Sequence, residues 1–470
     1  MALTDVKQSR QATGFSLVER LRTAAADLLS GEHAKTQRMA GAAFAIRIAS
    51  AGIVFASQAL LARWIGSHEF GTYVYVWTWL LLASDLIHLG LPLTAQRFVP
   101  EYTQADSIAL LRGYLAGSRW LTFAAGSAVA LIGATVVYAA RNAIEPQLVL
   151  PFYFACAALP VYGVTFMSDA LARSYNWINL ALLPAYVIRP LIFIAALAGM
   201  RAADVDLDAT KVMGVLVAAA WLAALLQMLQ LDRKLKTVVT AGPKSYDAGR
   251  WLSTALPIVF VWGLYTLLTS TDVLVLKQFR PAAEVAHYYA AAKTLALVSI
   301  IYFAVAATSA HRFTAYHVDG DRGGLEAFAA ATVRWVFWLS LALSLIIIAL
   351  GRPLLMLFGA EFVAANPVML ILAVGQLARA SVGPAERVLN VLGQQRSCAF
   401  AYAAAFTVNI GACLLLAPAY GAIGAAIATA AAFVVESASL FVIAKRALGL
   451  HMFIWDPWKR SREHAGADRR

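Results

Sequence analysis

The sequence is poor in charged residues. Only 14% of its 470 residues are Asp, Glu, Lys or Arg, whereas 61% are hydrophobic. Soluble domains contain about 25% charged and about 45 to 50% apolar residues. The composition therefore excludes an ordinary soluble protein and predicts that most of the chain lies in a lipid bilayer.

The sequence also lacks the common motifs of enzymes and metal sites. Its three cysteines, Cys156, Cys398 and Cys413, form no CxxC pair, which argues against a disulfide framework and a zinc site. It contains no GxxxxGK phosphate loop, no HExxH and no GxSxG. We therefore expect no catalytic residues, no metal and no cofactor.

Apolar stretches recur along the chain with short connections between them. A helix that crosses a bilayer needs roughly 20 largely apolar residues. Twelve windows satisfy this requirement, so the sequence predicts an all-α membrane protein with about 12 transmembrane helices. The predicted spans are 41–63, 71–93, 118–140, 149–171, 179–199, 212–231, 251–276, 285–309, 329–351, 365–386, 397–416 and 422–444.

The distribution of basic residues predicts the orientation. If both termini are cytoplasmic, the cytoplasmic segments hold 26 of the 38 Lys and Arg residues and the external loops hold seven. Lys and Arg resist translocation, so this asymmetry places both ends in the cytoplasm. The basic excess is then expected to face anionic lipid headgroups rather than nucleic acid.

The two ends of the chain differ from the rest. Residues 1–40 form a predicted cytoplasmic tail, in which Phe15–Leu29 is amphipathic and has no continuous apolar core. We expect no cleavable signal peptide here, but a helix on the inner membrane surface, with partner binding as the alternative. The basic tail 445–470 is a second predicted contact with anionic lipid.

A weak internal repeat divides the chain. A shift of 215 residues superposes six spans on six and aligns Leu61 with Leu276, Glu69 with Glu284, and Tyr73 with Tyr288. The basic segment 232–250 lies where a linker is expected. The repeat predicts two six-helix bundles in the same orientation, 41–231 and 251–444, with a cavity between them and an alternating-access mechanism.

Several charged residues fall inside the predicted spans. Each costs about 2.5 to 3.5 kcal/mol near the bilayer centre unless it faces water or a partner. The cations are Arg47, Arg189, Lys293 and Arg379, and the acids are Asp85, Asp272, Glu386 and Glu436. A cavity that carries these cations would suit a phosphate or pyrophosphate group, to which Arg offers bidentate contacts and Lys a point charge.

A structural role for these charges is the alternative. Arg47 could pair with Asp85, and Arg379 with Glu386, which would lock helices together. His88 could share a proton with Asp85, although a buried core histidine is the simpler interpretation.

Two further charges lie near span ends. Asp169 and Arg334 are predicted to extend toward the interface with water.

Five motifs stand in a fixed order along the sequence. The first-half segment is LLARWIGSHEFGTYVYVWTWLLLASDLIHLGLPLTAQRFVPEY (60–102), and the second-half segment is TDVLVLKQFRPAAEVAHYYAAAK (271–293). Later motifs are LFGAEFVAANPVMLILAVGQ (357–376), NVLGQQR (390–396) and PAYGAIGAAIAT (418–429). Each motif is loose, but their order and spacing are specific. In these motifs the sequence resembles the Wzx-type polysaccharide flippases of the multidrug, oligosaccharidyl-lipid and polysaccharide (MOP) exporter superfamily.

The resemblance implies translocation of a polyprenyl-pyrophosphate-linked oligosaccharide across the bacterial cytoplasmic (inner) membrane, for exopolysaccharide, capsule or lipopolysaccharide assembly. It also implies polymerase and co-polymerase proteins as candidate partners. The intramembrane cation that follows the second-half tyrosines is Lys293, and the acid that opens this half is Asp272. Ala286 replaces the family's usual glycine, and Gln278 and Arg280 make the loop less typical.

The resulting hypothesis gives each candidate residue a role. The phosphates are expected to bind the four cations Arg47, Arg189, Lys293 and Arg379. Sugar rings are expected to stack on Trp262 and Tyr265. An ion gradient of H+ or Na+ is the expected driver, with Asp85, Asp272 and Glu386 as coupling or cavity acids.

Three other functions are compatible with parts of the sequence. A cation-coupled exporter of drugs or metabolites would have the same fold, but its cavity should favour acids over bases. A membrane polysaccharide polymerase or ligase would need a sizeable external loop, which this sequence lacks. A purely structural role in a synthesis complex is compatible with every feature.

Overall fold

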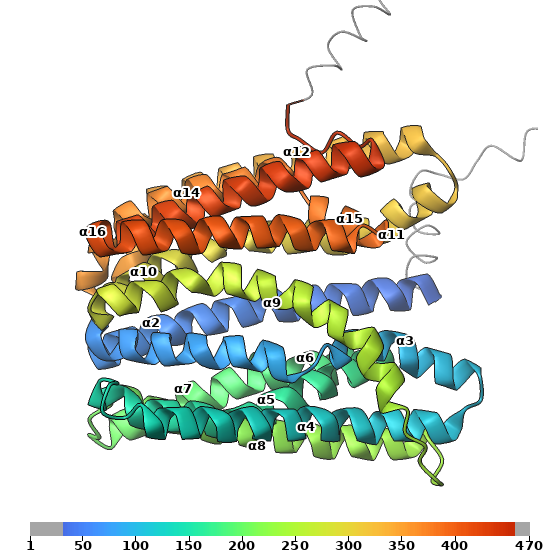
Figure 1. Cartoon of the computed structure of the whole chain (residues 1–470), viewed down its shortest axis with the longest axis horizontal. Coiled ribbons are helices and arrows are strands. Elements are labelled where there is room, and N and C mark those ends of the chain that lie inside the picture. Colours follow the sequence, from blue (N-terminus) through green and yellow to red (C-terminus); the bar gives the residue numbers. More distant parts are fainter. Residues whose placement is uncertain (1–31, 456–470) are drawn as a thin grey trace, which may run out of the picture.

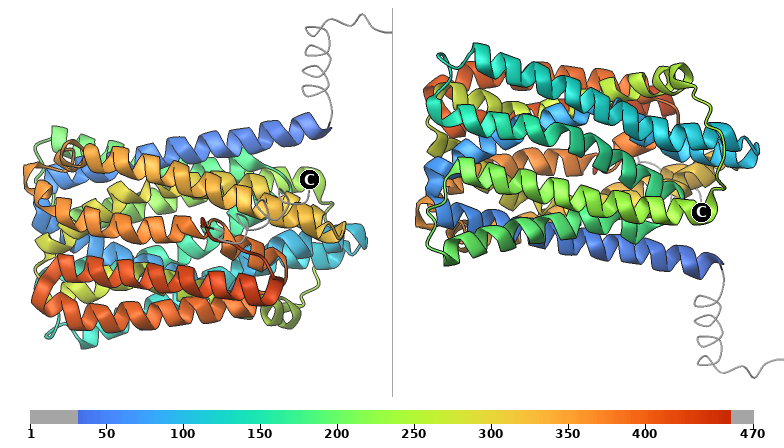
Figure 2. Two further views of the ribbon diagram at one scale, coloured as in Figure 1. Left: turned by 90° about the horizontal axis from the view of Figure 1, so that it is seen from above. Right: turned by 90° about the horizontal axis from the view of Figure 1, so that it is seen from below.

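The computed structural model describes residues 32–455. The predicted surface helix at Phe15–Leu29 and the part of the basic tail from residue 456 onward lie outside the described residues. Within the described range, ten helices are long and apolar enough to cross a membrane. Figures 1 and 2 show them running side by side, with their connecting turns gathered at two opposite ends.

The helices fall into two groups in chain order. The first group comprises α2 (Glu32–Ile87), α3 (Leu91–Gln104), α4 (Ile108–Ala139), α5 (Pro146–Ser174), α6 (Ile178–Leu183), the π-helical turn η1 (Pro184–Ile188), α7 (Arg189–Ala202) and α8 (Ala209–Val238). The second comprises α9 (Ala248–Phe279), α10 (Ala282–Ala296), α11 (Ser299–Val318), α12 (Arg322–Ala349), α13 (Gly351–Met356), η2 (Ala360–Ala365), α14 (Asn366–Ser381), α15 (Ala385–Val391), α16 (Gln395–Ile443) and η3 (Ala444–Leu448). We call these groups the first-half and second-half helices.

Two long helices are hairpins. α2 contains Gly66 at φ 75°, and α16 contains Gly421 at φ 56°, so each is interrupted by a non-helical residue. A positive φ is accessible to glycine at little cost, which explains why the chain reverses at these two positions. The Gln58 side chain reaches the Tyr73 hydroxyl across the α2 hairpin, at 3.4 Å. With these reversals the ten helices make twelve crossings, which confirms the predicted fold class.

The hydrophobic core is continuous between the halves at one end only. The ring of Phe70 in α2 lies 6.0 Å from that of Tyr289 in α10 and 6.4 Å from that of Phe358, within one cluster shared by both halves. At the other end, where α2 begins, two separate clusters form around Tyr114 and around Phe313. By the predicted orientation, the halves are joined externally and have separate cores at the cytoplasmic side.

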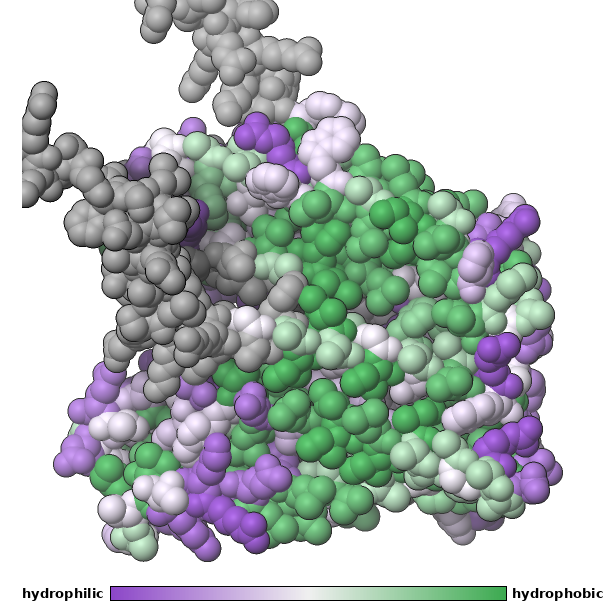
Figure 3. Space-filling view, turned by 180° about the vertical axis from the view of Figure 1, so that it is seen from behind, coloured by the Kyte–Doolittle hydropathy of each residue, from purple (hydrophilic) through white to green (hydrophobic). Residues whose placement is uncertain are grey.

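The outer surface is apolar. Figure 3 shows a broad hydrophobic band between hydrophilic ends. Large side chains such as Trp120, Leu131 and Phe400 are exposed. Soluble proteins rarely expose contiguous apolar surface of this extent. The chain is therefore a multi-pass membrane protein.

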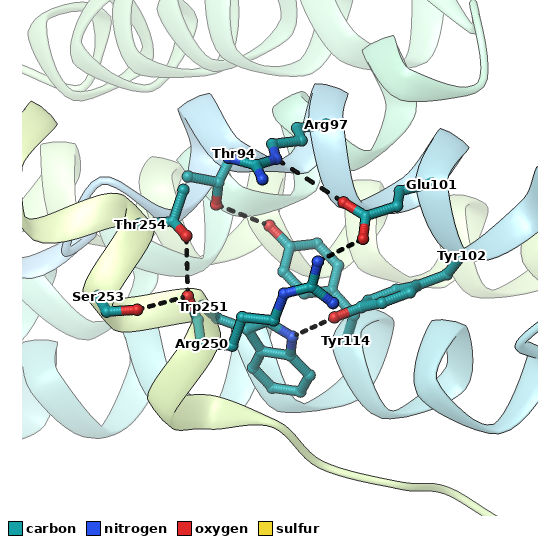
Figure 4. Close-up of polar contacts among 9 residues, drawn as sticks. All are labelled: Thr94, Arg97, Glu101, Tyr102, Tyr114, Arg250, Trp251, Ser253 and Thr254. Carbon is teal, nitrogen blue, oxygen red and sulfur yellow. Dashed lines mark hydrogen bonds and ion pairs between the residues drawn. The ribbon is translucent and has the colours of Figure 1, made fainter. Parts of the chain in front are cut away.

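The helix α9 belongs to the second-half helices, but its first turns pack against the first-half helices. The indole N–H of Trp251, which is fully buried, donates to the hydroxyl of Tyr102 at 3.0 Å, and Arg250 pairs with Glu101 at 2.5 Å (Figure 4). Further along α9, the backbone carbonyl of Leu268 accepts a hydrogen bond from Asn409 of α16 at 2.7 Å. The start of α9 is thus anchored to the first-half helices, while its later turns belong to the second-half core.

We expect Trp251→Ala to lower the free energy of unfolding by about 3 to 5 kcal/mol, because it removes a fully buried indole from this anchor. Trp335→Ala is the matched control, since Trp335 is 64% exposed on α12. Thermal unfolding of the two variants in nanodiscs measures the difference. Equal midpoints would contradict the anchoring role.

Candidate functional site

Three of the predicted cations lie at a similar depth in the membrane. Arg189 begins α7, Lys293 lies near the end of α10, and Arg379 lies near the end of α14. At a rise of 1.5 Å per residue, each is about 17 to 20 Å from the predicted external end of its helix. The hydrocarbon core is about 30 Å thick, so these charges lie near its centre.

Arg189 and Lys293 rest on aromatic rings. The guanidinium of Arg189 lies 4.9 Å from the ring centroid of Tyr162, and the ammonium of Lys293 lies 5.0 Å from that of Tyr289. Both cations are half-buried, and neither forms an ion pair with a residue whose side chain the structure describes. Asp169 lies within electrostatic range of Arg189, and Asp272 within range of Lys293. The Tyr73 hydroxyl is within electrostatic range of Arg189 and of Tyr289, on whose ring Lys293 rests.

Arg47 lies apart from these two cations. It is exposed, and its guanidinium lies 5.6 Å from the ring centroid of Tyr186. The alternative pairing of Arg47 with Asp85 does not occur among the described residues.

Arg379 differs from the other cations because it has an acid partner. Its guanidinium pairs with Glu436 of α16 at 3.2 Å and lies between the rings of Phe433 and Tyr265, at 4.7 and 5.7 Å from their centroids. The structure thus pairs Arg379 with Glu436 rather than with Glu386. Its charge is therefore neutralised locally.

Polar and aromatic side chains surround Arg379. Glu386 accepts hydrogen bonds from Tyr302 and from Asn390, both at 3.2 Å. The Tyr265 ring lies 5.5 Å from that of Tyr402, and the Trp262 ring lies 5.8 Å from that of Tyr265. We call the group Tyr265, Tyr302, Arg379, Glu386, Tyr402 and Glu436 the second-half cluster.

Asp85 lies between the two halves. Its carboxylate accepts a hydrogen bond of 2.6 Å from Thr266 of α9, and Trp262 lies nearby. His88 approaches it only to 3.9 Å, while the Nδ1 atom of His88 accepts from the backbone N–H of Gly90 at 3.1 Å. His88 is thus a buried histidine with a partner of its own.

Asp272 is buried where α9, α10 and α16 meet. Its carboxylate accepts hydrogen bonds from the hydroxyls of Tyr288 and Thr429, the second at 3.3 Å, and from the backbone N–H of Val273 at 2.8 Å. These donors hold the carboxylate at a junction of three helices.

Asp169 is a polar residue whose position the sequence interpretation missed. The expectation that it extends to the interface is wrong, because it is 2% exposed and accepts a 2.5 Å hydrogen bond from Gln227 of α8. Arg173, one turn away, lies 3.8 Å from it. A glutamine within an otherwise apolar span was the signal that could have indicated a buried polar partner. Arg334, by contrast, is exposed.

Polar contacts also join the halves at the predicted external end. Lys277 of α9, only 8% exposed, donates to Glu145 at the start of α5 at 2.6 Å. Gln278 donates to the Tyr75 hydroxyl at 2.9 Å. The carboxylate of Glu361 accepts from the backbone N–H of Ser67 at 3.0 Å. These contacts must break if the external end opens.

The pair of Glu145 and Lys277 should make stability depend on pH. The Lys277 ammonium that donates to Glu145 holds the pKa of this carboxyl below its ordinary value of 4.5. A carboxyl group with a depressed pKa in the folded state stabilises the protein at pH values above its ordinary pKa. This stability is lost as the pH falls through the folded-state pKa. We therefore expect the thermal midpoint of the wild type to fall toward that of Glu145→Gln as the pH is lowered from 7 to below 4.

Glu326→Gln is the matched control for that experiment. Glu326 pairs with Arg322 at 3.4 Å on the exposed surface of α12. Exposed pairs contribute little, so its midpoint should follow the wild type at each pH. A constant difference in thermal midpoint between the wild type and Glu145→Gln across the pH range would contradict a stabilising pair of Glu145 and Lys277.

Comparison with known proteins defines the class of fold. No protein-family model and no curated protein matches the sequence. Among solved structures, an inward-facing multidrug resistance MATE transporter of the MOP superfamily matches with a TM-score of 0.72 and 12% identity, covering 84% of this chain and 94% of that chain. The chain therefore has the fold of MOP superfamily transporters.

Two further solved structures extend the comparison. The lipid II flippase MurJ in an inward closed conformation matches with a TM-score of 0.66 and 13% identity, covering 86% of this chain and 87% of that chain. A MOP superfamily transporter from Pyrococcus furiosus, described as having a binding pocket of reverse polarity, matches with a TM-score of 0.63 and 13% identity, covering 87% and 95%.

Proposed function

We propose that this protein translocates a polyprenyl-pyrophosphate-linked oligosaccharide across the bacterial cytoplasmic membrane. The observation that carries the proposal is the presence of two half-buried cations, Arg189 and Lys293, near the membrane centre that form no ion pair among the described residues. Asp169 and Asp272 lie within electrostatic range of them but form no ion pair with them. An unpaired charge at this depth is costly unless it faces water or binds a ligand of opposite charge. A pyrophosphate group supplies that charge.

The proposed mechanism assigns the two halves to alternating access. Arg189 belongs to the first half and Lys293 to the second, so a pyrophosphate between them would contact both halves at once. Arg189 offers a bidentate contact and Lys293 a point charge, while the exposed Arg47 would attract the headgroup from the cytoplasmic side. The polyprenyl tail would remain in lipid. Opening of the external end then requires the contacts of Lys277 and Glu361 to break.

An ion gradient is the proposed driver. Asp85 touches α9 from α2, and Asp272 joins three helices of the second half. Binding of H+ or Na+ at either carboxylate would change the hydrogen bonds that position α9. Polymerase and co-polymerase proteins are the proposed partners in polymer assembly.

The second candidate function is a cation-coupled exporter of drugs or metabolites. The likeness to MATE transporters and the acids Glu386 and Glu436 favour it. Against it, Glu436 is already neutralised by Arg379, and Asp272 and Glu386 have their hydrogen-bond donors within the protein. The cations Arg189 and Lys293 form no ion pair among the described residues, so their site attracts anions. A polymerase or ligase fits less well, because the external connections are short.

The fate of lipid-linked intermediates in cells tests the proposed function. Cells that lack this protein should accumulate the lipid-linked repeat unit with its sugar exposed only on the cytoplasmic face. Accumulation on the external face would instead indicate a polymerase. Unchanged intermediates together with increased sensitivity to cationic drugs would indicate the exporter.

A further inference from the structure

The second-half cluster contains two buried polar atoms without a partner. Glu436 is 3% exposed; its Oε1 atom pairs with Arg379, but its Oε2 atom has no hydrogen-bond partner among the described residues. Tyr402 is 2% exposed, and its hydroxyl also has no hydrogen-bond partner among the described residues. Burying a polar group without a hydrogen bond costs roughly 1 to 3 kcal/mol. Two such groups in one cluster point to a ligand that satisfies them.

The two atoms belong to the same site. Arg379, which pairs with Glu436 at 3.2 Å, lies 5.7 Å from the ring centroid of Tyr265, and the Tyr265 ring lies 5.5 Å from that of Tyr402. Tyr402 is also within electrostatic range of Glu436 and Glu386. The cluster therefore presents a carboxylate oxygen and a phenol hydroxyl to one neighbourhood.

The charge balance of the cluster disfavours an anion. Its guanidinium, Arg379, is neutralised by Glu436 at 3.2 Å, and Glu386 adds a second carboxylate. Arg387, which follows Glu386, is exposed and forms no ion pair with a described residue, although it lies within electrostatic range of Tyr302. The two carboxylates are therefore balanced by Arg379, which is held by Glu436, and by this exposed guanidinium, so the described cluster holds no buried cation that is free to bind an anion.

The cluster is also aromatic and partly open. The rings of Trp262, Tyr265 and Tyr402 follow one another at centroid distances of 5.8 and 5.5 Å. Trp262 is exposed, while Tyr265 and Glu386 are half-buried. The C–H groups of a sugar ring pack on aromatic faces. Its hydroxyl groups donate hydrogen bonds to carboxylates and accept them from phenol hydroxyls. The carboxylates, hydroxyl and rings here match both features.

We infer that the second-half cluster is the saccharide subsite, selective for sugars that are neutral or carry an amine and closed to sugars that carry a carboxylate. The inference rests on the proposed function and divides the substrate between the halves. The pyrophosphate lies at Arg189 and Lys293, and the sugar lies against Tyr402 and Glu436. Arg379 then positions Glu436 instead of binding phosphate.

Binding of three disaccharide probes to the full-length protein in nanodiscs tests this inference. The probes are N,N′-diacetylchitobiose, which is neutral, its deacetylated amine, and digalacturonic acid, with inorganic pyrophosphate as a separate probe. We expect the first two to bind and digalacturonic acid to bind at least about tenfold more weakly, because the carboxylates repel it. Tyr402→Phe should raise the Kd of the neutral probe about tenfold, which is the effect expected from the loss of one buried hydrogen bond. It should leave pyrophosphate binding unchanged.

Three further variants complete the test. Tyr420→Phe is the matched control, because Tyr420 is exposed at the α16 hairpin, and it should bind all probes like the wild type. Glu436→Gln leaves Arg379 without its partner, so this variant should bind digalacturonic acid more tightly than the wild type. If Glu436→Gln does not fold, Glu386→Gln takes its place in the experiment, because it also removes a carboxylate from the cluster. Equal affinity for all three sugars, or an unchanged affinity of Tyr402→Phe for the neutral sugar, would contradict the proposed saccharide subsite. Absence of pyrophosphate binding in the wild type would contradict the proposed function itself.

Discussion

Replacing Arg189 and Lys293 together by glutamate should reduce polymer export about a hundredfold or more, while the protein still reaches the membrane. Each substitution reverses a charge that is half-buried near the bilayer centre and forms no ion pair with a described residue. Losing one buried charge contact costs about 2 to 5 kcal/mol, and each 1.4 kcal/mol corresponds to a factor of ten. Export is measured as surface polysaccharide per unit of membrane-inserted protein.

Arg201→Glu is the matched control for this double variant. Arg201 is exposed at the opposite end of α7 from Arg189, outside the proposed site. Its export should stay within about twofold of the wild type, because exposed charges are screened by solvent and salt. If the double variant exports normally at normal protein levels, these two cations do not bind the substrate.

Replacing Gly71 by leucine should force the external ends of the two halves apart. A Cβ atom at Gly71 would lie 1.7 Å from the backbone carbonyl oxygen of Ala282 in α10, which is shorter than any real contact. A backbone atom cannot rotate away, so α2 and α10 must separate. We expect the variant to lose export, because its external end no longer closes.

Thiol labelling from the external side measures this separation. A cysteine introduced at Ser67 is buried in the closed protein, and it should react about tenfold or more faster in Gly71→Leu, which corresponds to a shift of at least ~1.4 kcal/mol toward the open state. Gly52→Leu is the control on the same helix, since a Cβ atom there meets nothing within 4 Å. Equal labelling in both variants would show that the contact of α2 with α10 does not hold the external end closed.

The membrane class and the approximate spans could be predicted because they follow from local composition. Twenty apolar residues form a membrane helix whatever the partner helices are. The reversals at Gly66 and Gly421 were predicted as well, since they fall in the connections 64–70 and 417–421 between predicted spans. The structure adds the positive φ angle that marks each glycine as the turning residue.

The pairing of the buried charges could not be predicted in the same way. Arg379 pairs with Glu436, which is 57 residues away in sequence on another helix. Helical periodicity relates residues within one helix and carries no information on such a partner. Asp169 was misplaced for the same reason, because its burial depends on Gln227 of α8. The division into a cationic and a neutralised site therefore required the structure.

Translocation by the purified protein in proteoliposomes tests the central claim most directly. The substrate is a polyprenyl-pyrophosphate-linked oligosaccharide with a labelled sugar, and its arrival in the opposite leaflet is followed by accessibility to a membrane-impermeant lectin. We predict translocation by the wild type and by Arg201→Glu, and none above protein-free vesicles by the double variant of Arg189 and Lys293. Equal translocation by all three proteins, or none by the wild type in vesicles where it exports a cationic dye, would contradict the proposed function.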